Sequence, residues 1–578
     1  MDRRTFLGAT LQSKRHSDPL DPVKKGKIDP VSKLVNQELP QLQEVTSGLE
    51  AHTGDFEWAE ARHLLNRSLF GAKKAEIEQA VSDGLDATID KLVADWEEPD
   101  PPVYYSYNKD PNAPVGTSWV SHSRSPGGGV NPEGFRRRSL RYWALGLMAT
   151  QEVSLREKMA LFWHNHFATE LLFSGNDSRY SYQLMRLFRL HGLGNFKTLV
   201  EKVTVNPAML HYLNGNQNKV GAPNENYARE LFELFTIGKG PQIGEGNYTN
   251  YTEEDVREAA KVLTGWQPTG GLANAGYTGS LYRDNRHDKT TKQFSAAFNY
   301  KVIENQGEDE YKALIDMIFG QAETARYICR KLYRWFCYYV IDEPTEVFVI
   351  EPMVQLLIAN SFEIKPVVRA LLSSAHFYDL LRRGCIIKSP MDYVISMARK
   401  LEFEIPTVED YAYAYRLWGY FYAEAAKLQQ TFLTPPSVAG WPAYYQEPVY
   451  SQAWVNSATL PNRQFYASLI TSANGKKIYQ QNYLKLDVFK LLEQVSDPAD
   501  PNLVVSEIAD VLFPNGITDS QLIFLKDVLI PGLPDFEWTE EYILYLTDPE
   551  DPEPRMAVEN RLRALIQTMV SLPEIHLS

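Results

Sequence analysis

Two histidines, His164 and His166, lie at the end of the amphipathic segment SLREKMALFWHNHF. Neutral imidazole is the commonest side-chain ligand of transition metals, so the pair is a candidate for holding a divalent metal. Residues i and i+2 of a straight helix point about 200° apart, so both rings face one metal only if the helix ends between them. The alternative is that one ring packs in the core and hydrogen-bonds a carbonyl group while the other is solvated.

Carboxylates gather in the segment PNENYARELFELF, residues 223–235. Glu230 and Glu233 are spaced to share one face of a helix. Apolar neighbours leave this helix little surface for water, and a buried carboxylate needs a cation, a hydrogen-bond donor or a metal. Both glutamates are therefore candidate metal ligands, and Arg229 is a candidate for stabilising developing negative charge. The alternative is an internal network in which Arg229 pairs with a glutamate and fixes the packing of helices.

A third polar group lies in the irregular segment RDNRHDKTTK, residues 283–292. His287 is a candidate metal ligand, and the adjacent Asp288 is a candidate base. Lys292, four residues further on, is a candidate for stabilising negative charge. Loops carry functional residues disproportionately, although they also carry much inert charge.

Other motifs carry weaker catalytic signals. Ser437 in PPSVAGWP (435–442) is not part of a GxSxG elbow, so this segment is better interpreted as a structural turn anchored by Trp441. The glycines at 127–129 and 270–271 are not followed by GxxxxGK[ST] and do not form a phosphate loop. The three cysteines lack CxxC spacing and indicate neither a zinc site nor a disulfide framework.

The elements that must position these groups are predicted to be helices. Apolar residues recur at helical spacing while alternating strand patterns are scarce, so we expect an all-α fold. We expect a polar extended or disordered arm at 1–55, a large multi-helix globular body at 56–475, and a C-terminal helical part at 476–578 packed on it. A long irregular insertion at about 266–308 is suited to a short hairpin. The proline- and glycine-rich segment 99–135 predicts a long loop, which is usually functional or disordered.

Charge and hydropathy exclude two classes of interaction. The 59 Lys and Arg against 73 Asp and Glu give a net charge of −14, and no run of five or more basic residues occurs. Binding to a phosphate backbone relies on clustered basic residues, so we expect no nucleic-acid partner. No stretch reaches the roughly 18–20 consecutive apolar residues of a membrane span, so we expect no transmembrane segment.

The first residues, MDRRTFLGAT, contain Arg3 and Arg4 in a pattern similar to the twin-arginine export signature. The apolar run that follows ends after a few residues, whereas a signal needs roughly 7–15 apolar residues. Three interpretations stay open: a degenerate signal, export alongside a signal-bearing partner, and chance. The first two favour a periplasmic or cell-envelope location over the cytoplasm.

Several long motifs together carry a family resemblance. In chain order they are HLLNRSLFG (63–71), FWHNHF (162–167), PNENYARELFELFTIG (223–238), YTEEDVREAAKVLTGW (251–266), HDKTTK (287–292), and PPSVAGWP (435–442) with Trp454-Val455-Asn456. This series resembles the large bacterial family catalogued as domain of unknown function 1800, over roughly residues 57–470.

The resemblance also implies a companion protein. Members are commonly encoded beside a family catalogued as domain of unknown function 1501, which looks like the alkaline-phosphatase and sulfatase superfamily and often bears a twin-arginine signal. Export with such a companion would fit the abbreviated signal of this chain.

Two functional hypotheses follow. In the first, the protein is a non-catalytic binding or scaffold protein of the cell envelope, and its aromatic residues, 12% of the chain, contact a partner protein or a glycan. In the second, it is a metal-dependent hydrolase or oxidoreductase with histidine and glutamate ligands. Both hypotheses expect the polar motifs to converge in one pocket lined by aromatic side chains.

Overall fold

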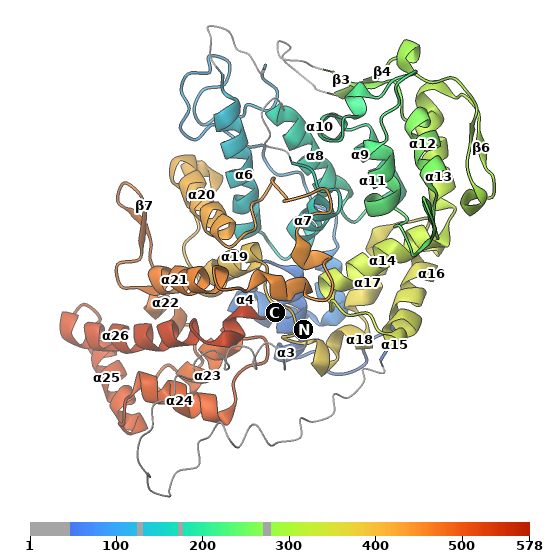
Figure 1. The fold of residues 1–578 in the computed structure, drawn as a ribbon. Helices are drawn as coiled ribbons and strands as arrows, with labels where there is room; N and C mark the ends of the chain where they lie inside the picture. The colour runs from blue at the N-terminus through green and yellow to red at the C-terminus, as the bar shows by residue number, and fades with distance from the viewer. Residues whose placement is uncertain (1–46, 124–130, 171–176, 270–278) are drawn as a thin grey trace, which may run out of the picture.

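The computed structural model describes residues 47–123, 131–170, 177–269 and 279–578 (Figure 1). The twin-arginine-like start and most of the arm predicted at 1–55 lie outside these residues, as do the glycines at 127–129 and 270–271. In the described part, the all-α prediction is confirmed, because helices build the body and the strands form only short antiparallel pairs.

The helices are distributed along the whole described chain. In its first half they are α3 (Trp58–Ser68), α4 (Lys74–Asp83), α5 (Leu85–Leu92), α6 (Glu133–Ala149), α7 (Arg156–His166), α8 (Ser178–His191), α9 (Phe196–Thr204), α10 (Pro207–Tyr212), α11 (Asn226–Glu230) with its π-helical continuation η2 (Leu231–Phe235), and α12 (Glu253–Val262). In its second half they are α13 (Glu310–Phe319), α14 (Ala322–Phe336), α15 (Glu343–Thr345), the π-helix η6 (Glu346–Ile350), α16 (Glu351–Ala359), α17 (Ile364–Leu372), α18 (Ala375–Tyr378), α19 (Pro390–Lys400), α20 (Tyr411–Lys427), α21 (Thr459–Thr471), α22 (Val488–Leu492), α23 (Pro501–Leu512), α24 (Asp519–Leu529), α25 (Asp535–Thr547) and α26 (Pro552–Met569).

The predicted hairpin in the insertion is present. β3 (Trp266–Thr269) pairs with β4 (Gly279–Tyr282), and β5 (Lys292–Gln293) pairs with β6 (Val302–Ile303). Two further antiparallel pairs lie elsewhere: β1 (Gln242–Gly244) with β2 (Asn247–Tyr248), and β7 (Lys476–Tyr479) with β8 (Asn482–Leu484).

Two glycines bring α6 and α20 into close contact, although these helices are far apart in the sequence (Figure 1). A Cβ atom on Gly146 of α6 would lie 2.4 Å from the ring of Trp418 on α20. Conversely, a Cβ atom on Gly419 of α20 would lie 2.6 Å from the ring of Tyr142 on α6. Each helix therefore offers a gap that an aromatic ring of the other helix fills.

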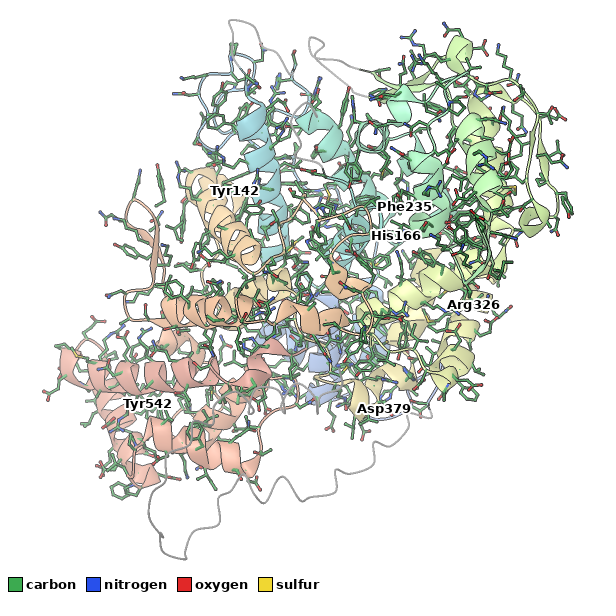
Figure 2. The ribbon with its side chains drawn as sticks, in the orientation of Figure 1. Tyr142, His166, Phe235, Arg326, Asp379 and Tyr542 are labelled. Carbon is green, nitrogen blue, oxygen red and sulfur yellow. The ribbon has the colours of Figure 1, made fainter. Side chains whose placement is uncertain are left out.

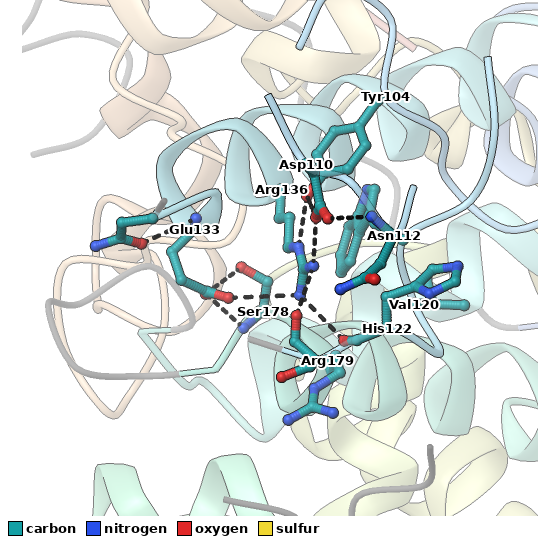
Figure 3. Close-up of polar contacts among 12 residues, drawn as sticks. Tyr104, Asp110, Asn112, Val120, His122, Glu133, Arg136, Ser178 and Arg179 are labelled. Atoms are coloured by element: carbon teal, nitrogen blue, oxygen red, sulfur yellow. Dashed lines mark hydrogen bonds and ion pairs between the residues drawn. The ribbon is translucent and has the colours of Figure 1, made fainter. Parts of the chain in front are cut away.

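A buried ion group anchors the described part of the loop predicted at 99–135 (Figure 3). Arg136 of α6 donates through Nη2 to Asp110 at 2.9 Å and through Nε to the Tyr104 hydroxyl at 2.6 Å. Tyr104 in turn donates to Asp110 at 2.9 Å, so the three side chains form a closed ring of hydrogen bonds. Arg136 also donates to the backbone carbonyl of Ser123 at 2.8 Å. Residues 99–123 are therefore packed on the helices.

The C-terminal helices α22–α26 are tied to the rest of the molecule. α26 packs on α21, and Arg563 of α26 donates to the carbonyl of Thr471 at the end of α21 at 2.9 Å. Near the other end of the chain, Lys74 of α4 lies 2.7 Å from the Glu507 carboxylate on α23. The division into domains at about residue 475 stays a prediction. None of the described helices combines the length and the apolar character that a bilayer crossing demands.

Candidate functional site

His164 is fully buried on α7 and faces the segment that follows α20. Its Nε2 accepts a hydrogen bond from the Leu433 backbone at 3.2 Å, and its ring lies edge-on to Trp441. The neighbouring Asn165 accepts from the Trp441 backbone at 3.0 Å, and a Cβ atom on Gly440 would lie 2.3 Å from the Asn165 Oδ1 atom. Burial lowers the pKa of His164 to about 3. The FWHNHF and PPSVAGWP motifs thus hold each other in place.

His166 points away from His164, because α7 continues through both residues. The Nε2 atom of His166 is 2.9 Å from the carbonyl of Phe235, which is next to it in Figure 2. A ring that donates through Nε2 has an acceptor at Nδ1, and the Lys331 Nζ lies 3.1 Å from that atom. Burial, and then the charge of Lys331, lower the pKa of His166 well below its usual value.

Lys331 is a half-buried lysine that the sequence analysis did not single out. Its Nζ also donates to the carbonyl of Leu234 at 3.3 Å and lies 4.7 Å from the centre of the Tyr327 ring. Burial, and then the charge of Arg334, lower the pKa of Lys331 to about 7. A signal was present in the sequence, because Lys331 lies three residues after Ile328 and directly before Leu332, both of which are buried on α14.

The glutamate pair lies where α11 changes into the π-helix η2. π-helical turns inside helices are frequent at functional sites. Glu233 accepts a hydrogen bond from the Tyr251 hydroxyl at 3.1 Å and lies 3.5 Å from the Lys239 Nζ. Glu230 is half-buried, and burial together with the nearby charge of Glu233 raises its pKa to about 7. A carboxyl group with such a pKa can give or take a proton at neutral pH.

Arg229 is engaged in an ion-pair network. It lies 3.1 Å from Glu225, four residues earlier in the chain, and it also makes two hydrogen bonds of 2.7 and 2.8 Å to the carboxylate of Glu253 on α12. The hydrogen bonds from Arg229 lower the pKa of Glu253. This arrangement is an Arg–Glu network as in the alternative that the sequence left open, but its side chains are partly exposed. Glu253 could not be found as a partner because it lies 24 residues away in the chain.

His287 and Lys292 share one buried carboxylate, that of Glu310 at the start of α13. The Nε2 atom of His287 is 2.9 Å from Glu310, and the Lys292 Nζ is 2.6 Å from its other oxygen. The side chains of all three residues are completely buried. His287 Nδ1 faces the carbonyl of Thr264 at 3.0 Å. This group fastens the insertion to α13, and Glu310 was not singled out from the sequence.

Asp288 does not point at His287. Its carboxylate accepts hydrogen bonds from the backbone and the hydroxyl of Thr290, at 2.9 and 2.5 Å. Its backbone N–H donates to the Thr264 hydroxyl at 2.8 Å. Asp288 therefore shapes the turn that leads to Lys292.

The predicted metal ligands are distributed over three places. His164 faces the PPSVAGWP segment, and His287 belongs to the Glu310 group. Only His166 lies against the π-helix that follows Glu230. Across the described ranges, no three His, Cys, Asp or Glu side chains are arranged to hold a metal ion. Metal binding at these residues stays a prediction.

The comparisons with known proteins identify a family. The described part of the chain is a mainly helical body, and motifs far apart in the sequence contact each other in it. Residues 63–566 match the family described as "Protein of unknown function (DUF1800)", and the chain belongs to this family. No curated protein and no solved structure matches the chain.

Proposed function

We propose that the protein is a non-catalytic binding or scaffold protein of the bacterial cell envelope. In this proposal it acts with a companion of the phosphatase- and sulfatase-like family catalogued as domain of unknown function 1501. The C-terminal helices supply the contact surface, and the polar motifs keep the helical body rigid.

The partners of the motif residues support a structural role for them. Arg229 is paired with Glu253, Lys292 with Glu310, and His166 with the backbone of Phe235. Side chains engaged in this way fix the packing of helices.

The exposed apolar side chains of α25 carry the proposal. Trp538 is the one residue of this helix that is buried, whereas Phe536, Ile543, Leu544 and Leu546 are all more than half exposed. A helix that is apolar on several sides is normally covered by other protein. Ile523 and Phe524 of α24 are exposed as well. Large exposed apolar side chains in such number favour an interaction surface.

Co-expression with the companion tests the proposal. The full chain should elute with the companion from a size-exclusion column, and light scattering should give the mass of a complex. Leu544→Glu, at a side chain that is 60% exposed, should abolish the complex because it places a charge in the apolar contact.

Ile243→Glu is the matched control. Ile243 is 68% exposed but lies on the β1–β2 hairpin, so this variant should form the complex as the wild type does. The proposal is wrong if wild-type protein elutes as a monomer beside the companion, or if both variants bind it equally well.

A metal-dependent hydrolase or oxidoreductase is the second candidate, and one observation favours it. Glu230 is half-buried, has a raised pKa and has Glu233 beside it, which is typical of catalytic carboxylates. Metal analysis of the purified chain tests this candidate: a stoichiometric transition metal that is lost in both Glu230→Gln and His166→Ala would favour the enzyme. If both variants keep the metal, its ligands are other residues of the chain.

A further inference from the structure

A small cavity is lined by residues of α3, α7, α14 and α19 and of the segments around 386–389 and 443–454. Its volume is about 50 Å³. Since one water needs roughly 10–15 Å³, this is space for roughly three to five waters, which is the size of one tetrahedral oxyanion.

The charges around this cavity are mostly positive. Arg67, Lys158, Arg334 and Lys388 line it, and Asp392 is the acidic side chain among the lining residues, which also include Ser578. The whole chain has a net charge of −14, so this concentration of cations runs against the average of the molecule.

Only part of this positive charge is neutralised. Lys158 forms an ion pair with Asp392, and Arg334 lies 3.7 Å from the exposed Glu447. The other two cations, Arg67 and Lys388, form no ion pair with any residue that the structure describes.

Arg67 and Lys388 are both more than nine-tenths buried. Arg67 donates through Nη2 to the carbonyl of Arg382 at 3.0 Å, and its Nε has no hydrogen-bond partner among the described residues. Lys388 donates to the carbonyl of Ile575 at 2.9 Å. The hydroxyl of Ser451, which also lines the cavity, is buried and has no partner in the described ranges either. Burying a cation whose only hydrogen-bond partners are neutral groups costs free energy. An anion bound between Arg67 and Lys388 would remove that cost.

We propose that this cavity is a binding site for a doubly charged oxyanion, a phosphate or sulfate group, held by Arg67, Lys388 and Ser451 with Arg334 at its solvent side. Two uncompensated cations match two negative charges better than the single charge of a carboxylate. Arginine and lysine make short, charge-assisted hydrogen bonds to such groups. The side chain of Arg334 is 27% exposed, which gives the cavity a polar entrance.

The state of Lys388 is consistent with an anion site. Burial lowers the pKa of Lys388 to about 7, with Asp392 opposing this effect and Arg463 and Lys158 adding to it. A bound anion would favour the charged form of the ammonium group.

Calorimetric titration of the full chain with inorganic phosphate and with sulfate, at constant ionic strength, tests the site. We expect saturable binding of one anion per chain and none of acetate. Lys388→Gln and Arg334→Gln should each weaken binding by roughly tenfold or more, the effect of losing one charge-assisted hydrogen bond.

Lys400→Gln controls for the loss of a buried lysine. Lys400 is as buried as Lys388 and donates to the carbonyl of Leu512 at 3.2 Å, but it does not line this cavity. It should lower the thermal unfolding temperature as Lys388→Gln does and leave anion binding unchanged. Arg334→Gln changes a partly exposed residue, so it keeps the test valid if the lysine variants fold poorly.

A parallel titration with glycerol 3-phosphate identifies the source of the anion. Tighter binding of the ester assigns the site to a phosphate group on a larger molecule, and tighter binding of inorganic phosphate assigns it to the free ion. Absence of saturable binding to all three anions would overturn the proposal, and so would equal affinities in the wild type, Lys388→Gln and Arg334→Gln.

Discussion

Several buried charged residues of this protein form groups whose members come from different segments, as His287, Lys292 and Glu310 do. His164 shows why such partners are difficult to predict. The sequence indicates correctly that adjacent imidazoles on a helix diverge, but the Leu433 backbone that bonds to His164 lies 269 residues away. The residue types of the polar motifs could therefore be identified from the sequence. Their partners could not, because tertiary packing selects them.

Glu310 should be the most sensitive residue of the buried groups. Glu310→Ala leaves His287 and Lys292 without their common carboxylate in a completely buried position. Removing one member of a buried ion pair costs about 3–5 kcal/mol, so we expect a loss of that size in the free energy of unfolding. Denaturant unfolding measures it, with the exposed neighbour Glu308→Ala as the control. Equal midpoints for the two variants would contradict the role of Glu310.

The raised pKa of Glu230 predicts a pH dependence of stability. The unfolded carboxyl ionises near 4.5, while the folded one keeps its proton up to about pH 7. The folded state therefore binds more protons over this range, and stability falls as the pH rises through it. Glu230→Gln removes this loss, so the variant should match the wild type near pH 4 and exceed it at pH 8. Because the side chain is partly exposed, we expect a gain on the order of 1–2 kcal/mol.

Denaturation midpoints measured at pH 4, 6 and 8 check this prediction. Glu245→Gln, at an exposed position beside the β1–β2 hairpin, should follow the wild type at every pH. A Glu230→Gln variant less stable than the wild type at pH 8 would show that the carboxylate stabilises the folded state.

At the scale of elements, sequence periodicity predicts the helices well and their mutual contacts poorly. In the segment PNENYARELFELF the residue spacing predicts one helix, and the structure has α11 followed by the π-helix η2. Tertiary contacts stabilise a π-helical turn of this kind. Here they include the contact between the Phe235 carbonyl and His166. The contact between α6 and α20 could not be predicted either. A glycine within a helix indicates only that the helix is less stable there, and it does not indicate which ring packs against it.

Gly146→Ala should destabilise the contact between α6 and α20. The new methyl group would lie 2.4 Å from the buried Trp418 ring, and overpacking of this kind costs about 1–3 kcal/mol. Gly134→Ala is a control on the same helix, because a Cβ atom there meets nothing within 4 Å. It should stabilise the protein by about 0.5–1 kcal/mol, since alanine favours a helix over glycine. Thermal unfolding should therefore shift in opposite directions for the two variants.

At the scale of the whole molecule, the contacts run between the beginning and the end of the chain. α26 packs on α21, and α23 is joined to α4 through Lys74 and Glu507. Arg62 of α3 also lies 3.2 Å from Asp510 on α23. The sequence predicts a C-terminal part packed on the body, but it does not indicate that the first helices contribute to this contact.

These connections predict that the C-terminal helices unfold together with the first helices. Lys74→Met removes the ion pair with Glu507 and a hydrogen bond to the carbonyl of Gln494, so it should cost about 1–3 kcal/mol. In a cooperative unit this cost raises the hydrogen-exchange rates of α23 and α4 by the same factor, because both helices exchange through one opening reaction. Faster exchange confined to α4 would instead indicate independent units, and would support a domain boundary near residue 475. Lys91→Met, which removes an exposed ion pair with Asp83 at the end of α4, should leave the exchange of α23 unchanged, since exposed pairs contribute little to stability.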